Sequence, residues 1–243
     1  MQMPMRAIWL VLFLALPLGA EAVDDSQILF EKMLSIAQKG NPEAQYHVGM
    51  MLNNGYGVEK DPHQALQWFT KSANAGDPLG AYKLGCYYGG QYNVVPKDAG
   101  KSLKYKLIAA KAGYALAQHD VGIDYFRNQQ FDKAIYWWKL AAKQGFPMSL
   151  YNLSIIYWEG KVVPKDNTLA YAYFKLSQLA AYGRVNENAQ NALNNIKKNM
   201  LPKEVQNAED IVKHWNAKPS PLTVKASSGL NEAQRLIRSY DKP

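Results

Sequence analysis

The chain has 243 residues, of which 48% are hydrophobic and 20% are charged, so it can bury a core and lacks the composition of a disordered protein. Its single cysteine excludes an intrachain disulfide framework and a zinc site built from clustered cysteines. The net charge of +8 favours acidic partners without specifying one. The four histidines form no metal motif, so we predict neither a metal site nor a cofactor: His47, His63, His119 and His214.

Residues 1–22 have the features of a secretory signal peptide. Arg6 is followed by an apolar run over 7–16, and Ala20 and Ala22 occupy the two small positions of a signal-peptidase site. The run is well short of the roughly 20 residues that cross a bilayer as a helix. The alternatives are an uncleaved anchor and a buried first helix. We predict cleavage after Ala22, a periplasmic or secreted protein, and no integral membrane segment after cleavage.

The rest of the chain repeats itself. The pattern Ala-x-x-Gly recurs five times, with its glycines 32 to 38 residues apart: Gly40, Gly76, Gly113, Gly145 and Gly183. This is the range of helix-pair repeats, which are about 34 residues long in tetratricopeptide proteins. The spacing predicts four units, over 41–76, 77–113, 114–145 and 146–183.

Each unit predicts two helices, which we name A and B. In the first unit Ala44, Val48, Gly49 and Leu52 lie on one face of the A helix, and similar residues follow at the same places in later units. Aspartates that precede the B helices are typical N-caps: Asp61, Asp98 and Asp166. The closing glycine ends each B helix.

Further helices flank the four units. Residues 23–40 predict a lone N-terminal capping helix, and residues 184–217 predict two C-terminal capping helices. Residues 218–243 contain the linker-like segments Pro219–Pro221 and Ser227–Gly229. A short amphipathic helix follows and either folds back or docks on a partner; its apolar residues are Leu230, Ala233, Leu236 and Ile237.

The first unit resembles a Sel1-like repeat, a helix-pair family related to tetratricopeptide repeats. The resemblance rests on Ala44–Gly49, Asn54–Asp61, Ala65-x-x-Trp68 and Ala73-x-x-Gly76, and the fourth unit keeps Val163–Asp166. It implies an all-α, right-handed α-solenoid of about four helix pairs with capping helices at both ends. It also implies binding to other proteins, often at the bacterial envelope. We therefore expect a bacterial exported scaffold that binds a protein or peptide in its concave groove.

Enzyme motifs are missing from the sequence, and we predict that the protein is not an enzyme. There is no phosphate loop, G-x-S-x-G or H-E-x-x-H motif, and the S-x-x-K match at Ser239–Lys242 lies at the chain end. The alternative is a cell-envelope enzyme or a binder of small molecules or glycans, for example β-lactams or peptidoglycan, using the same groove. A structural spacer is a third option.

Two further features have a functional and a structural interpretation. Four lysines form one helical stripe, which is a solvated convex face or an attraction for an anionic polymer: Lys97, Lys101, Lys104 and Lys111. Nucleic acid is not expected, because no stacking aromatics lie among them. Cys86 stands where other units have apolar residues, so we expect it to be unpaired and structural.

Aromatic residues on the A helices form the candidate partner-binding site. They lie beside the buried stripe, on the side that we expect to be concave, and we name them the ladder residues: Tyr46, Tyr82, His119, Phe126, Tyr151 and Trp158. Tyrosine and tryptophan are favoured anchors at interfaces because they bury much area at low entropic cost. The alternative is that the ladder residues only pack one A helix on the next.

Overall fold

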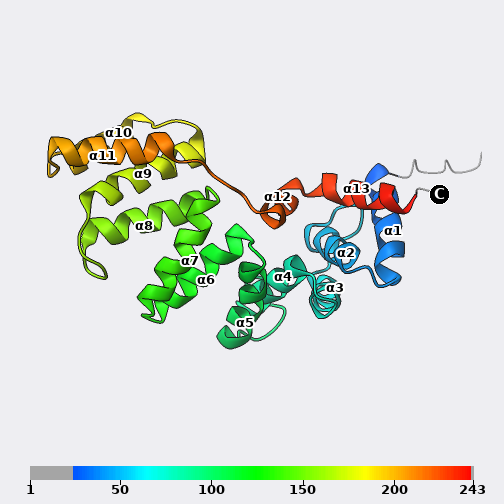
Figure 1. The fold of residues 1–243 in the computed structure, drawn as a ribbon. Helices are drawn as coiled ribbons and strands as arrows, with labels where there is room; N and C mark the ends of the chain where they lie inside the picture. Colours follow the sequence, from blue (N-terminus) through cyan, green and yellow to red (C-terminus); the bar gives the residue numbers. More distant parts are fainter. Residues whose placement is uncertain (1–23, 242–243) are drawn as a thin grey trace, which may run out of the picture.

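The computed structural model describes residues 24–241, and within them it is all-α, with about 74% of residues helical and no strand (Figure 1). The predicted signal peptide at 1–22 lies outside the described residues. Helix pairs follow one another along an arc, which confirms the predicted α-solenoid.

The predicted units correspond to four helix pairs, each with an A helix in contact with its B helix. A capping helix precedes them and two follow. The bounds are α1 (Asp25–Gln38); α2 (Pro42–Asn54) and α3 (Pro62–Asn74); α4 (Pro78–Tyr88) and α5 (Ala99–Lys111); α6 (Ala115–Arg127) and α7 (Phe131–Lys143); α8 (Pro147–Glu159) and α9 (Asn167–Tyr182); α10 (Glu187–Lys197) and α11 (Pro202–His214).

The helix ends follow the predicted capping chemistry. Asp61, Asp98 and Asp166 each accept a hydrogen bond of 2.9 Å from the backbone N–H three residues on, which confirms them as N-caps. At the other end of α3, Gly76 has φ = 91° and its N–H donates to the Ala73 carbonyl at 3.1 Å. Only glycine adopts this backbone conformation without strain, so the repeated glycine ends the helix.

Small residues on the A helices let each B helix approach closely. A β-carbon at Gly49 would lie 2.7 Å from the Phe69 ring, and one at Gly122 would lie 2.4 Å from the Trp138 ring. Both rings are fully buried or nearly so. Gly49 and Gly122 are therefore required by the contact between the two helices of their pairs.

The C-terminal segment folds back on the solenoid. After α11 the chain runs in extended form to α12 (Pro221–Ser228) and α13 (Leu230–Tyr240), which lies against α1 and α2 at the opposite end (Figure 1). Ala233 and Ile237 of α13 join the buried cluster that contains Met33 and Val48. The predicted amphipathic helix thus covers the first repeat of its own chain.

The segment before α13 contains a helix that the sequence did not predict. Residues 219–221 and 227–229 were expected as linker, but α12 occupies 221–228. Ser220 caps this helix by accepting a hydrogen bond from the Thr223 N–H at 3.0 Å, and Pro221 takes the first helical position. The Pro-Ser-Pro sequence that is typical of a linker is here a helix start, because proline at that place loses no hydrogen bond.

We expect Gly122→Ala to lower the free energy of unfolding by at least about 1 kcal/mol, because the added methyl would displace the packed Trp138 ring. The steric penalty of the added methyl more than offsets the roughly 1 kcal/mol that alanine otherwise gains over glycine within a helix. Urea denaturation measures the change.

Gly100→Ala is the matched control. Gly100 also lies in a helix, but its added methyl would come no closer than 3.4 Å to another atom. We expect its stability to be unchanged or slightly higher. Equal stability of Gly122→Ala and the unchanged protein would contradict the close-approach argument.

Candidate binding surface

Two of the six ladder residues are buried between repeats. The Tyr82 ring packs edge-on against Tyr114 at 5.1 Å between centroids, and its hydroxyl donates to Asp120 at 3.1 Å. The His119 ring packs on Phe146 at 5.0 Å, and its Nδ1 lies 2.9 Å from the Ser149 hydroxyl. Tyr82 and His119 therefore pack one repeat on the next, as in the alternative given for the ladder residues, and their role in partner binding stays a prediction.

The aromatic residues that cover Tyr82 and His119 come from the start of the next repeat. Tyr114 and Phe146 are the residues that directly precede α6 and α8, so each closes over the A helix of the preceding repeat. Burial lowers the pKa of the His119 imidazole, which favours its neutral form. A buried neutral histidine with a hydroxyl partner contributes to packing.

Phe126 and Trp158 lie near the far ends of their A helices. Phe126 is partly exposed and contacts Phe131 and Trp138 of its own B helix, with centroids 5.2 and 5.4 Å apart. The Lys165 ammonium lies 4.4 Å from the Trp158 ring centroid. Both rings are thus fixed by neighbours within their own repeat, and their role in partner binding stays a prediction.

Tyr151 belongs to an open apolar surface on α8. Met148, Tyr151 and Ile155 are 55%, 42% and 36% exposed, and we name these three residues the α8 face. The corresponding residues of α4 are nearly buried, with Leu79 at 3% and Cys86 at 7%. The residue before α10 is Asn186 rather than an aromatic, so the cover that Tyr114 and Phe146 give is not repeated.

The C-terminal segment is anchored along the junctions between repeats. The Gly113 carbonyl accepts hydrogen bonds from the Ser220 hydroxyl and the Gln144 amide, both at 2.8 Å. The Thr223 hydroxyl donates to Oε1 of the same Gln144 amide at 2.7 Å. Further along, the Lys225 ammonium pairs with Glu43 at 2.6 Å. This segment therefore contacts the first three repeats by specific polar bonds.

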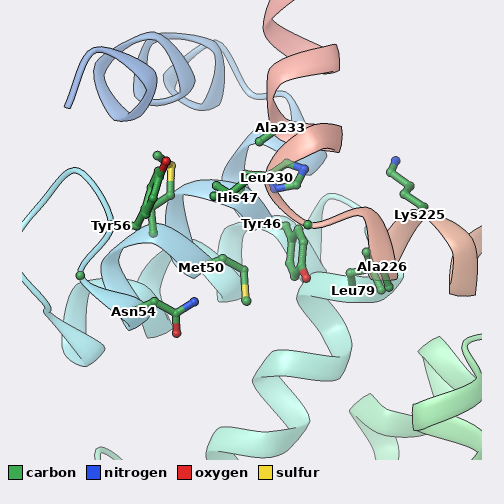
Figure 2. Close-up of a pocket in the computed structure, with 13 residues that line it drawn as sticks. Tyr46, His47, Met50, Asn54, Tyr56, Leu79, Lys225, Ala226, Leu230 and Ala233 are labelled. Carbon is green, nitrogen blue, oxygen red and sulfur yellow. The ribbon is translucent and has the colours of Figure 1, made fainter. Parts of the chain in front are cut away.

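A cavity of about 270 Å³ lies between α2 and the returning segment (Figure 2). Tyr46, the sixth ladder residue, forms part of its wall, and its ring contacts Phe69 at 6.2 Å between centroids. Burial raises the pKa of the Tyr46 hydroxyl. Sequence reasoning missed this cavity because one wall comes from Leu230 and Ala233, about 180 residues further along the chain.

Neither the α8 face nor the cavity has a cluster of metal-binding side chains among the described residues. Among residues 24–241 no three His, Cys, Asp or Glu side chains are placed to hold a metal ion. No helix within this range has the length and apolar character needed to cross a membrane.

The Ser239 hydroxyl, which belongs to the S-x-x-K match, donates to the Leu236 carbonyl of its own helix at 2.6 Å. The lysines of the predicted stripe are exposed.

Cys86 is unpaired and only 7% exposed, and burial raises the pKa of its thiol. We expect it to react with iodoacetamide at neutral pH far more slowly in the folded protein than in urea, because the reactive thiolate is disfavoured and shielded. Mass spectrometry of timed samples measures the rate. Equal rates in the two states would contradict a structural role.

Comparison with known proteins identifies the repeats. The model of the Sel1 repeat matches residues 42–77, 78–114, 114–146 and 147–177. A putative sel1-like repeat-containing protein, L21 of Acanthamoeba polyphaga mimivirus, is 38% identical over 125 residues, which cover 51% of this chain and 22% of that protein. The uncharacterized protein NMB1327 of Neisseria meningitidis serogroup B is 29% identical over 63% of this chain and 35% of that protein.

This chain thus spans about a fifth to a third of the length of these curated relatives. Among solved structures, a Sel1 repeat protein from Oxalobacter formigenes aligns with a TM-score of 0.62 at 23% identity. The alignment covers 87% of this chain and 80% of that one, and it shows the fold alone.

Proposed function

The chain belongs to the Sel1 repeat family, and on that premise we propose that it is an exported scaffold that binds a protein or peptide partner. Sel1 repeats mediate protein–protein interactions. The observation that carries the proposal is the α8 face, where Met148, Tyr151 and Ile155 stay exposed although the same positions in α4 are covered. Contiguous exposed apolar side chains favour an interaction site.

The shape of the surface favours a polypeptide over a small substrate. Stacked helix pairs present a wide, shallow surface, and residues at i, i+3 and i+7 of α8 form one continuous stripe. An amphipathic helix or extended segment can contact such a stripe along its length. Tyr151 is the expected anchor, because an exposed tyrosine offers a large apolar ring together with a hydroxyl.

Export is proposed on the sequence of residues 1–22. If the signal peptide is cleaved after Ala22, the intact mass of the exported protein will correspond to a chain that begins at Val23. Expression of the full-length chain in a Gram-negative host, followed by osmotic-shock fractionation and mass spectrometry, makes the measurement. An exported protein that retains Met1 would contradict cleavage.

Partner binding is tested by crosslinking from the α8 face. With p-benzoylphenylalanine placed at position 148, irradiation in an envelope extract should give a crosslinked species that the same residue at position 136 does not give. Tyr136 is 57% exposed on a B helix and is the matched control. Tyr151→Ala should then weaken binding of the purified partner by about 1–3 kcal/mol, as removal of an interface anchor does.

Stability separates binding from packing. Because Tyr151 is 42% exposed and its ring contacts Phe174, with centroids 6.2 Å apart, Tyr151→Ala should lower the melting temperature only modestly. Tyr136→Ala, at a residue that is 57% exposed, is the control for this modest change. Tyr82→Ala, at a buried position of the same register, should cost about 3–5 kcal/mol of unfolding free energy. Full-strength partner binding by Tyr151→Ala would exclude the α8 face as the contact surface.

A further inference from the structure

The cavity between α2 and α13 has the size of a site for one aromatic side chain. Its volume is about 270 Å³. A dry apolar cavity of about 150 Å³ is already large enough to bind benzene. The space therefore admits a phenyl ring with some margin, and it is below the volume of about 300 Å³ at which sites for drug-sized molecules begin.

The wall of the cavity is suited to an aromatic ring. Met50, Leu79 and the Tyr46 ring line it, as Figure 2 shows, and Met51 is a further lining residue. Methionine side chains adapt their shape and make favourable contacts between sulfur and aromatic rings. Leu230 and Ala233 of α13 also line the cavity, so it exists only because the C-terminal segment is docked.

The charges at the cavity select a neutral occupant. Lys225, the charged residue among those that line it, is already paired with Glu43 at 2.6 Å, and Figure 2 shows its side chain extending away from Met50. His47 lies beside the same carboxylate, with its Nε2 3.8 Å from Glu43. Because Lys225 and Glu43 are paired with each other, a charged ligand would lose its hydration and gain no free counter-ion from this pair, which is costly. The Nε2 of His47 is buried beside them without a hydrogen-bond partner.

The rim of the cavity is open to a polypeptide. Leu230 is 41% exposed and Tyr56 is 37% exposed, and both line the cavity. An occupant can therefore reach the solvent between them, as a side chain attached to a backbone must. We propose that this cavity is an anchor pocket for a single phenylalanine side chain of the partner; this extends the proposed function, on which it rests, to a second contact point.

The test uses methionine methyl signals as local reporters. The protein is labelled with ¹³C-methyl methionine and titrated with N-acetyl-L-phenylalaninamide. The methyl signals of Met50 and Met51 should shift saturably, while that of Met200, which packs against the cluster containing Tyr171 and Leu193 and lies outside both proposed contact surfaces, should not. Met50→Leu and Met51→Leu variants assign the two signals.

Two variants at exposed leucines complete the experiment. Leu230→Trp places a large ring at the rim and should weaken binding of the probe at least tenfold. Leu201→Trp changes a leucine that is 67% exposed at the start of α11, far from the cavity, and should alter the affinity by less than twofold. Because both positions are exposed, neither change should unfold the protein.

A toluene titration separates the possible occupants. Toluene and the amide probe should both shift Met50 and Met51. Shifts with toluene alone would overturn the proposal, since the pocket would then admit a free ring but no side chain on a backbone. Shifts with neither, or equal effects of the two tryptophan variants, would also overturn it.

The result is independent of the α8 experiment. Loss of partner binding in Tyr151→Ala without any shift at Met50 would leave the proposed function standing and remove the pocket. Probe binding at Met50 together with full-strength partner binding by Tyr151→Ala would remove the α8 contact and leave the pocket in place.

Discussion

A helix pair in this protein cannot bury its apolar face by itself, so every pair depends on the surface that the next one supplies. Within a pair, Gly49 and Gly122 bring the A helix against the rings of Phe69 and Trp138. At two of the junctions between pairs an aromatic residue that precedes one A helix closes over the previous A helix: Tyr114 packs on Tyr82 and Phe146 on His119. The arc in Figure 1 is the result of these contacts repeated along the chain.

This dependence makes the two ends of the array special. At the N-terminal end, α1 and α13 together cover α2, and Ile237 enters the same buried cluster as Met33. At the C-terminal end, α10 and α11 pack on α9, and the α8 face remains open. The end of the array is thus capped, and the α8 face beside it is the exposed apolar surface that we propose as the partner contact.

The C-terminal segment also has an effect beyond covering α2. It is held by the Gly113 carbonyl and Gln144 before it reaches α2, so its path is determined at the junctions between repeats. The cavity beside Tyr46 forms where α13 meets α2 at a distance that leaves room for a ring. Two apolar surfaces of different kinds, an exposed face and a cavity with an open rim, thus lie on the A helices of a single solenoid.

Much of the architecture follows from the sequence alone, because it depends on local rules. Asp61, Asp98 and Asp166 cap helices through a bond to a residue three positions away, and the closing glycines act within one turn, so both could be predicted from spacing. The helix at 221–228 was missed because Pro-Ser-Pro serves linkers and helix starts equally well.

Which ladder residues are buried could not be predicted, since Tyr82 and Tyr151 occupy the same place in their repeats. Only the tertiary structure decides that Tyr82 meets Tyr114 and that Tyr151 meets no such cover, because burial depends on which residue a distant part of the chain brings into contact. The return of α13 to α2, and with it the cavity, is decided in the same way, by contacts between residues nearly two hundred positions apart.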